Sequence, residues 1–383
     1  MGENTRMIAP MNLKKRYLSD QVEQDLMAKM VFVGGPRQVG KTTLAKSLLG
    51  PDKAGYLNWD IAQDRERILR HELPDVPFWA FDEIHKYKSW RSYLKGVYDQ
   101  FGRSKKIVVT GSAKLNLYRR GGDSLQGRYH YLRLHPLSVA ELRIDTKGDF
   151  DDLLELGGFP EPFFLGKAIE AKRWSREYRQ RLIQDDLTAL ESIRDLGNLE
   201  LLMLRLPDLV GSPLSVNALR EDLGVSHKTV AHWLDVFANL YAIFRVSPFG
   251  SPSIRAVKKE QKHYHFDWTL VTDPGARFEN MVACHLLKWV QFEQDTKARE
   301  LELRYFRDID GREVDFVVTD NGKPIYAIEC KSGIKDINPA LRYFKAKFPD
   351  CTAWQVSATE GSAYINRDGV KYSHALELLK GLV

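Results

Sequence analysis

The sequence is poor in cysteine and has no long apolar run. Its three cysteines, Cys284, Cys330 and Cys351, are odd in number and lack CxxC spacing. This pattern argues against structural zinc and for a reducing compartment. No stretch approaches the ~18 consecutive apolar residues of a membrane span, and the opening residues MGENTRMIAPMNLKKRY lack the apolar segment of a signal peptide. We therefore expect a cytoplasmic protein with no membrane partner.

The chain also lacks a strong excess of either charge. Its 57 Lys and Arg residues exceed its 51 Asp and Glu residues slightly, and the net charge of +6 permits a nucleic-acid partner without requiring one. Hydrophobic residues make up 43% and charged residues 28%, which is the balance of a soluble globular protein. With 383 residues the chain is too long for one ordinary core, so we expect more than one domain.

The strongest motif in the chain is MVFVGGPRQVGKTTLAKSLLG, residues 30–50. Its apolar start predicts a strand, and the leucines at its end predict a helix. A glycine-rich loop between the two binds phosphate, because its backbone N–H groups and the helix dipole both favour an anion. Strand context, spacing and the GKTT ending favour this P-loop over a chance match. The residues expected to bind ATP are Gly35, Pro36, Arg37, Gln38, Val39, Gly40, Lys41, Thr42 and Thr43.

Four side chains near this loop have expected roles in ATP hydrolysis. Lys41 would reach the β- and γ-phosphates, and the Thr42 hydroxyl would bind Mg²⁺. An apolar strand in VPFWAFDEIHKYKSW (76–90) ends in Asp82 and Glu83. Asp82 would hold Mg²⁺ through water, and Glu83 would polarise the attacking water. Such an acidic pair can also cap the next helix, but its position after the P-loop favours catalysis.

Two further residues are candidates for phosphate contact. A third apolar strand, in KKIVVTGSAKLN (105–116), places Ser112 where a polar group senses the γ-phosphate. Arg128, in SLQGRYHYLRLHPLSVAEL (124–142), is the leading candidate for an arginine that contacts phosphate. Arg119 and Arg120 are weaker candidates, because basic residues in a polar loop are usually solvated.

These segments together resemble the AAA+ ATPases. The likeness is greatest to the group in which the ATPase module precedes a domain of uncharacterised function, DUF4143. It is carried by GGPRQVGKTT, FDEIH, VVTGSA, SLQGRYHYLRLHPLS and GGFPEP, and it extends over nearly the whole chain. The resemblance implies ATP and Mg²⁺ as cofactors. Alternating strands and helices independently predict an α/β domain with a mostly parallel sheet.

The middle of the chain is predicted to be helical. KAIEAKRWSREYRQRLIQDDLTALESI (167–193) is basic in its first half. A solvated charged face is the expected explanation, with a phosphate-backbone contact as the alternative. Asp185 and Asp186 would pair with these arginines or contact a neighbouring subunit. The second alternative would make the protein a homo-oligomer.

SPLSVNALREDLGVSHKTVAHWLDVFANLYAIFRVSPF (212–249) predicts a helix-turn-helix followed by a strand pair or wing. Ser215 and Ser226 are expected to cap the two helices, and Gly224 is expected in the turn. The start of the second helix is the part that touches DNA in such motifs. Packing or protein contact alone is the alternative. The candidate DNA-binding residues are His227, Lys228, Thr229 and His232.

The last part of the chain predicts a helix and three strands. DPGARFENMVACHLLKWV (273–290) has helical periodicity, with Glu279 just inside its start. LELRYFRDIDGREVDFVVTDNGKPIYAIECKSG (301–333) reads as three strands, and its Asp310-Gly311 and Asn321-Gly322 pairs predict tight turns.

Three carboxylates and a lysine on these segments form a candidate metal site. Asp315 lies among apolar residues, a costly place for a carboxylate unless it is paired or binds metal. Glu329 and Lys331 are two apart on a strand and so share a face; a surface ion pair is the alternative. With Glu279, this order resembles the PD-(D/E)xK nuclease-like fold, although Cys330 departs from its usual aliphatic residue. The three carboxylates would hold Mg²⁺, and Lys331 would orient water or stabilise developing charge.

We therefore expect an α/β protein with four parts. They are an AAA+-like P-loop domain (1–150), a helical linker (151–205), a winged helix-turn-helix (206–255) and a nuclease-like domain (256–383). The expected function is Mg²⁺-dependent ATP hydrolysis with action on DNA. The alternative is a non-cleaving ATP-gated switch that binds DNA or a protein partner.

Overall fold

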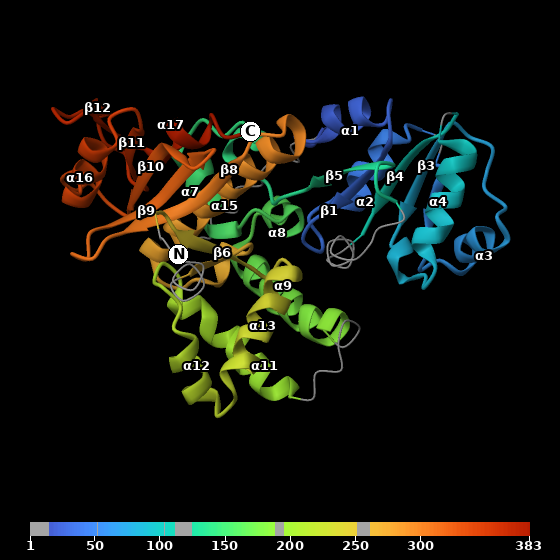
Figure 1. Ribbon diagram of the computed structural model, residues 1–383, viewed down its shortest axis with the longest axis horizontal. Coiled ribbons are helices and arrows are strands. Elements are labelled where there is room, and N and C mark those ends of the chain that lie inside the picture. Colours follow the sequence, from blue (N-terminus) through green and yellow to red (C-terminus); the bar gives the residue numbers. More distant parts are fainter. Residues whose placement is uncertain (1–14, 52, 103, 112–124, 188–194, 251–260) are drawn as a thin grey trace. The chain divides into compact units, whose positions relative to one another are not determined.

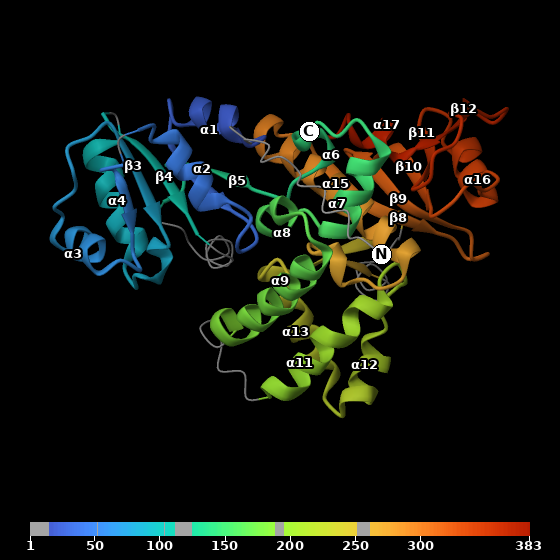
Figure 2. The same ribbon diagram turned by 180° about the vertical axis from the view of Figure 1, so that it is seen from behind.

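The computed structural model describes most of the chain and divides it into two compact units. The described residues are 15–51, 53–102, 104–111, 125–187, 195–250 and 261–383. The smaller unit consists mainly of residues 15–136, and the larger consists of residues 137–238 and 242–383. Figures 1 and 2 show the elements from opposite sides. Each unit has a sheet of its own.

A parallel sheet forms the centre of the smaller unit. Its strand order is β2-β3-β4-β1-β5, and every neighbouring pair is parallel. Central strands of such a sheet are apolar because both faces are covered, and every residue of β1 is buried. The strands are β1 (Met30–Gly34), β2 (Tyr56–Asn58), β3 (Phe78–Asp82), β4 (Lys106–Thr110) and β5 (Tyr129–Arg133).

Aromatic and aliphatic side chains join this sheet to its helices. Phe32, Trp79 and Phe81 of the strands pack with Leu94 of a helix in one buried cluster. Because the strands are parallel, the carboxyl ends of β1, β3 and β4 lie at one edge of the sheet, where α/β proteins bind ligands. This arrangement confirms the expected α/β fold. The helices are α1 (Ser19–Asp25), α2 (Lys41–Leu48), α3 (Ala62–Arg70), η1 (Ile84–Lys86) and α4 (Trp90–Phe101).

Helices form the first part of the larger unit. The Thr146 hydroxyl accepts a hydrogen bond from the Asp149 N–H (3.1 Å) and so caps α7, while Pro160 begins α8. The helices are α6 (Val139–Leu142), α7 (Lys147–Leu156), α8 (Pro160–Leu165), α9 (Ala168–Arg181), η3 (Leu182–Leu187), α11 (Leu196–Arg205) and η4 (Leu206–Leu209).

The GGFPEP segment has a packing role. Phe159 is buried, with its ring centroid 4.8 Å from that of Trp174 and 5.1 Å from that of Tyr178. Gly157 has a φ of 84°, and a Cβ at this position would lie 2.8 Å from Thr269 Cγ2. The glycine is therefore required for steric reasons, and the segment fixes the start of α8 against α9.

Two helices joined by a turn lie within the segment predicted to be a helix-turn-helix. The Ser215 hydroxyl accepts a hydrogen bond from the Ala218 N–H (3.2 Å) at the start of α12 (Val216–Leu223). Gly224 ends this helix in the left-handed region, with a φ of 65°. The Ser226 hydroxyl accepts from the Thr229 N–H (3.0 Å) and caps α13 (His227–Asn239). Both caps and the turn lie where the sequence predicts them.

The strands after α13 belong to the C-terminal sheet. β6 (Ile243–Pro248) pairs antiparallel with β7 (Lys262–His265) and in parallel with β8 (Leu301–Arg307). Through these pairs the expected wing continues into an eight-stranded sheet of order β12-β13-β11-β10-β9-β8-β6-β7. Ile243, Phe244 and Val246 of β6 are buried, as in a covered strand.

The C-terminal sheet is mixed and is packed by α15 and α16. Asn321 and Gly322 have φ values of 49° and 77°, the backbone that a two-residue hairpin turn requires. In the described residues, no helix combines the length and apolar character needed to cross a bilayer. The remaining elements are η5 (Trp268–Leu270), α15 (Pro274–Lys297), β9 (Glu313–Asp320), β10 (Lys323–Lys331), α16 (Pro339–Lys347), β11 (Thr352–Ser357), β12 (Tyr364–Ile365), β13 (Val370–His374) and α17 (Ala375–Leu379).

Candidate nucleotide site and C-terminal carboxylate cluster

The P-loop connects the end of β1 to the start of α2. Gly35, Gln38 and Gly40 have φ values of 145°, 58° and 99°, so the loop reverses through conformations that favour glycine. A Cβ at Gly35 would lie 2.2 Å from the Leu134 carbonyl oxygen, which excludes any other residue there without a shift. The loop thus brings backbone close to the space before α2, where N–H groups bind phosphate.

Lys41 is buried at the first position of α2. Its Nζ donates to the carbonyl oxygens of Gly35 (3.0 Å) and Pro36 (2.6 Å), so the ammonium lies within the loop. From this position its charge can neutralise phosphate oxygens that the loop binds. Thr43 is exposed, whereas Arg37 and Gln38 are half-buried.

Asp82 is held by three hydroxyl groups at the carboxyl edge of the sheet. Thr42 Oγ1 and Tyr56 Oη donate to its Oδ2 at 2.7 and 2.6 Å. Thr110 Oγ1 donates to its Oδ1 at 2.6 Å. A carboxylate beside a hydroxyl at the start of the P-loop helix is a donor set that suits a hard cation such as Mg²⁺. The residues here therefore fit Mg²⁺–ATP.

Sequence reasoning did not find Tyr56 and Thr110. The sequence did contain a signal for Thr110, because this polar residue ends an apolar strand as Asp82 does. In the structure the two strands are neighbours, and Thr110 is the register partner of Asp82. Tyr56 comes from the short strand β2, which has no motif. Burial and the hydrogen bond to Asp82 raise the pKa of Tyr56, so it remains a hydrogen-bond donor.

Glu83 follows Asp82 in a left-handed conformation, with a φ of 57°. Its N–H donates to the Thr110 carbonyl oxygen (3.0 Å), and its Oε2 lies 3.6 Å from His85 Nε2 and 3.5 Å from Lys86 Nζ. Burial raises the pKa of Glu83, although the positive charges of Lys86 and Lys41 oppose this rise. A non-glycine residue in this conformation is often found at a functional site.

Arg128 is not brought to the P-loop within the smaller unit. Its Nε donates to Asp99 Oδ1 (2.7 Å), and its carbonyl oxygen accepts from the Met30 N–H (3.1 Å) where β1 begins. Since β1 and β5 are parallel, Arg128 lies at the edge opposite the P-loop. Arg133, at the other end of β5, is the register partner of Gly34. Ser112 lies outside the described residues.

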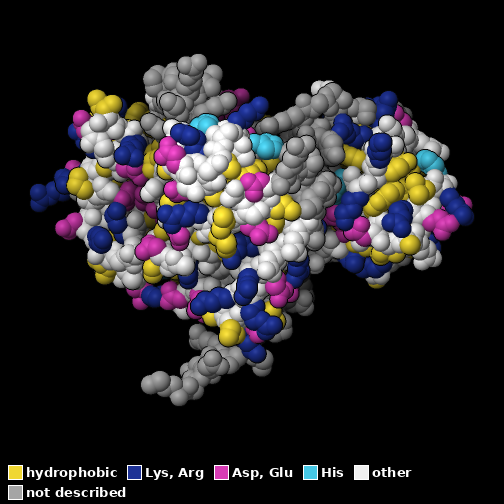
Figure 3. Space-filling model, turned by 90° about the horizontal axis from the view of Figure 1, so that it is seen from below, with side chains coloured by type: hydrophobic (Ala, Val, Ile, Leu, Met, Phe, Trp, Pro, Cys, Tyr) yellow, Lys and Arg dark blue, Asp and Glu magenta, His cyan; other side chains and the backbone are white. Residues whose placement is uncertain are grey.

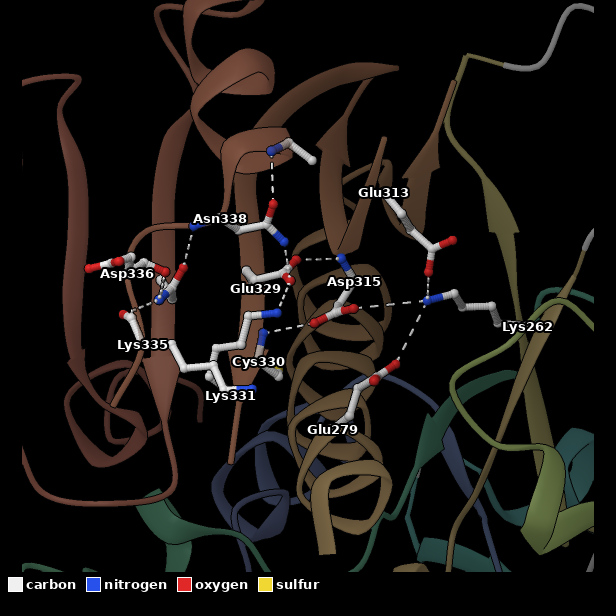
Figure 4. Close-up of polar contacts among 12 residues, drawn as sticks. Lys262, Glu279, Glu313, Asp315, Glu329, Cys330, Lys331, Lys335, Asp336 and Asn338 are labelled. Atoms are coloured by element: carbon white, nitrogen blue, oxygen red, sulfur yellow. Dashed lines mark hydrogen bonds and ion pairs between the residues drawn. The ribbon is translucent and has the colours of Figure 1, made fainter. Parts of the chain in front are cut away.

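In the larger unit, the structure brings the predicted carboxylates close together (Figure 4). Glu329 Oε1 accepts from Lys331 Nζ (2.5 Å) and from Asn338 Nδ2, and its Oε2 accepts from the Asp315 N–H (3.4 Å). Asp315 Oδ2 accepts from the Cys330 N–H (2.8 Å). Glu329 and Lys331 therefore lie side by side at the end of β10, next to Asp315.

Lys262, which the sequence analysis missed, lies among these carboxylates. Its side chain has 0% exposure, and its Nζ is 2.6 Å from Glu313 Oε1, 3.8 Å from Glu279 Oε1 and 4.0 Å from Asp315 Oδ1. Tyr264 Oη also donates to Glu279 Oε1 (2.7 Å). Lysine at the first position of a short strand has no sequence signal for such a role.

Burial and electrostatic interactions shift the pKa values of the groups in this cluster. Burial raises the pKa of Asp315 well above its usual value, and the negative charges of Glu279 and Glu329 add to the rise. Burial also raises the pKa of Glu279. Burial alone would lower the pKa of Lys262, but the surrounding carboxylates raise it above its usual value, so the lysine stays charged.

These contacts do not fit a divalent metal. Among the described residues, no three His, Cys, Asp or Glu side chains are arranged to hold a metal ion. Mg²⁺ requires several oxygen ligands at about 2.1 Å in octahedral geometry. In this cluster the carboxylates instead surround an ammonium group.

The candidate DNA-binding residues lie at the start of α13. His227, Lys228 and His232 are exposed, whereas Thr229 is half-buried and its hydroxyl lies 2.8 Å from that of Ser226. The start of α13 is therefore accessible. On the face shown in Figure 3, acidic side chains are interspersed among Lys and Arg side chains.

Three family models match successive parts of the chain. Residues 27–143 match an AAA domain. Residues 147–273 match DUF8612 and residues 274–373 match DUF4143, both domains of unknown function. With the P-loop and the parallel sheet, the first match defines the class of this part of the chain: residues 27–143 form an AAA-type ATPase domain. The matches to the AAA domain and to DUF4143 agree with the resemblance of the sequence to the AAA_14/DUF4143 group.

Known relatives align over most of the chain at low identity. An uncharacterized Haemophilus influenzae protein is 21% identical over 354 residues, covering 82% of this chain and 85% of the relative. An uncharacterized Mycobacterium tuberculosis protein is 23% identical over 342 residues, covering 85% and 76%. The solved structure of the Thermotoga maritima RuvB Holliday junction branch migration motor matches at 17% identity, covering 65% of this chain and 95% of that one. The TM-score of this match is 0.28.

Proposed function

We propose that the chain is a Mg²⁺-dependent ATPase whose nucleotide state controls its binding to DNA. The observation that carries the ATPase part is the position of Asp82. Its carboxylate is held by the hydroxyls of Thr42, Tyr56 and Thr110 at the edge of the sheet where the P-loop begins. The nearby Lys41 ammonium lies inside the loop.

Each residue of this site has a distinct role. When bound, Mg²⁺–ATP supplies the phosphoryl group and a cation that neutralises its charge. The backbone of the loop binds the phosphates, and Lys41 neutralises their negative charge. Thr42 and Asp82 hold the cation. Glu83 orients a water molecule and accepts its proton, for which its partly buried carboxylate is suited.

The DNA-binding part rests on the start of α13. Three of its four candidate residues are exposed there, after a serine cap that leaves the first turn facing outward. Helices in this position of a helix-turn-helix contact base edges or phosphates. A protein partner for the same surface is the second candidate, since the exposed Glu221 and Asp222 come shortly before this helix in the sequence.

For the C-terminal domain, we propose that it binds DNA or a protein partner and does not cleave DNA. The arrangement of Glu279, Asp315, Glu329 and Lys331 supports a nuclease-like architecture. The Lys262 ammonium beside these carboxylates favours a domain that does not use metal to cleave a phosphodiester.

DNA binding in two nucleotide states tests the proposal. The affinity of the full chain for DNA is measured with ADP and with a non-hydrolysable ATP analogue, in the presence of Mg²⁺. We expect the two affinities to differ by about 5–150-fold, the range of a coupling free energy of 1–3 kcal/mol. Equal affinities would exclude nucleotide control, and an absence of ATP turnover in the presence and absence of DNA would exclude the ATPase itself.

A further inference from the structure

The position of Lys262 is fixed by its backbone. As the first residue of β7, Lys262 is the register partner of Val246 on β6. On its other side it forms an isolated bridge with Pro213, and the Leu214 N–H donates to the Gln261 carbonyl oxygen (2.9 Å). Backbone pairing on two sides therefore directs this side chain into the unit, where it is fully buried.

Three carboxylates from two elements converge on its ammonium group (Figure 4). Glu279 is on α15, whereas Glu313 and Asp315 are two residues apart on β9. Their oxygens lie 2.6–4.0 Å from Lys262 Nζ. The Tyr305 ring centroid lies 5.2 Å from the same nitrogen, so an aromatic face adds to the favourable surroundings of the cation.

The charges in this cluster depend on one another. A buried ammonium is tolerated only when carboxylates compensate its charge, and buried carboxylates need a cation for the same reason. Lys262 and the three carboxylates provide this compensation to one another, with Nζ–O distances of 2.6–4.0 Å. The positive charge of Lys262 thus offsets one of the negative charges that a metal ion would otherwise have to offset.

Several other carboxylate oxygens close to Lys262 are engaged by other donors. Asp315 Oδ2 accepts from the Cys330 N–H, and Glu329 accepts from Lys331 and Asn338. Gly211 also approaches closely, because a Cβ there would lie 3.1 Å from Glu279 Oε2. A metal ion would have to displace several of these contacts to obtain its ligands.

We propose that the Lys262 ammonium takes the place of a divalent metal in this cluster. The C-terminal domain therefore keeps Glu279, Glu313 and Asp315 together without metal. This inference concerns the larger unit alone and does not depend on ATP hydrolysis.

Titration of the nucleotide-free full-length protein with Mn²⁺, followed by calorimetry and electron paramagnetic resonance, tests this inference. Wild-type protein and Asp315→Asn should bind Mn²⁺ equally weakly, because the carboxylates already have their cation. Lys262→Met keeps the length of the side chain and removes its charge. The Lys262→Met protein should bind Mn²⁺ at least tenfold more tightly than wild type. The double variant Lys262→Met/Asp315→Asn should lose this gain in affinity.

A matched control is Lys288→Met. Lys288 is also a buried lysine in the larger unit, and its Nζ lies 2.7 Å from Glu141 Oε2. Its removal affects the Glu141 carboxylate and not the cluster of Glu279, Glu313 and Asp315, so we expect lower stability with no gain in Mn²⁺ affinity.

Two results would overturn the inference. The first is tight Mn²⁺ binding by wild type that Asp315→Asn abolishes, which would place a metal in the cluster alongside Lys262. The second is a folded Lys262→Met that binds Mn²⁺ no better than wild type. If Lys262→Met folds only when Mn²⁺ is added, the inference is supported directly, and if it folds in neither condition, the comparison of wild type with Asp315→Asn decides.

Discussion

At the scale of single residues, Asp82 shows how a parallel sheet gathers hydroxyl groups around one carboxylate. Thr110 comes from the neighbouring strand, Tyr56 from the strand on the other side, and Thr42 from the P-loop helix. Hydrogen bonds to a charged group contribute about 1.5–3 kcal/mol each. The orientation of this carboxylate therefore depends on groups that are distant in sequence.

Removing one of these hydroxyls should weaken the site measurably. Tyr56→Phe deletes the donor to Asp82 and should raise the Mg²⁺ concentration required for ATP turnover by roughly tenfold, since about 1.4 kcal/mol corresponds to a factor of ten. Tyr98→Phe is the matched control, because the Tyr98 hydroxyl donates only at 3.4 Å to the Ala28 carbonyl oxygen on an exposed part of the same unit. An unchanged Mg²⁺ requirement in Tyr56→Phe would mean that this bond does not position Asp82.

Glu83 should separate ATP binding from turnover. Glu83→Gln keeps the shape of the side chain and removes its basic oxygen, so ATP should bind as in wild type while turnover falls by about 10²–10⁴-fold. Lys41→Ala should instead abolish tight ATP binding. Glu66→Gln, on the exposed face of α3, serves as the control. Turnover by Glu83→Gln at the wild-type rate would remove Glu83 from this role.

The pH dependence of turnover follows from the same residue. Because burial raises the pKa of Glu83, this group should be protonated at a higher pH than an ordinary glutamate. A protonated Glu83 cannot accept a proton, so turnover should fall as the pH falls through the raised pKa. A pH profile of kcat checks this, and the acid limb should be absent from the residual activity of Glu83→Gln.

At the scale of elements, the helix-turn-helix shows strong agreement between local sequence and structure. Ser215, Gly224 and Ser226 perform the capping and turning that their residue types favour. The following strand behaves differently, because β6 pairs with β8, which lies more than fifty residues further along the chain. Its membership of the C-terminal sheet depends on that distant partner.

Charge reversal at the start of α13 tests the DNA contact. Lys228→Glu should weaken DNA binding and reduce the slope of log affinity against log salt by about 1, because one phosphate contact is lost. Lys172→Glu makes the same charge change at an exposed position of α9 and should have a smaller effect. Equal effects of the two variants, in a titration at several salt concentrations, would assign the DNA contact to a different surface.

At the scale of the whole molecule, the two units carry separate chemistries. The smaller unit contains the P-loop and Asp82, and the larger contains α13 and the Lys262 cluster. Control of DNA binding by ATP therefore requires coupling between units, and such coupling is reciprocal.

Saturating DNA should change the affinity for the nucleotide by the same factor that the nucleotide changes the affinity for DNA. ATP binding to Glu83→Gln, which avoids turnover, is measured with and without DNA. A change in only one direction would show that the two measurements do not report a single equilibrium, and no change in either would leave the two units uncoupled.

The sequence by itself determined the P-loop, the acidic pair after β3, the helix-turn-helix with its caps and the hairpin turn at Asn321. These features depend on local rules: glycine adopts positive φ, serine caps helices, and apolar periodicity distinguishes strands from helices. Their signals lie within a few consecutive residues, and they can be recognised before the chain is folded.

Only the tertiary structure decided which distant residues meet. The parallel order of the sheet placed Arg128 at the edge opposite the P-loop and Thr110 beside Asp82. Backbone pairing of β7 placed Lys262 among carboxylates from α15 and β9. A buried charge is tolerated only near its partner, and those partners are brought together by strand pairing between distant segments, which no local pattern encodes.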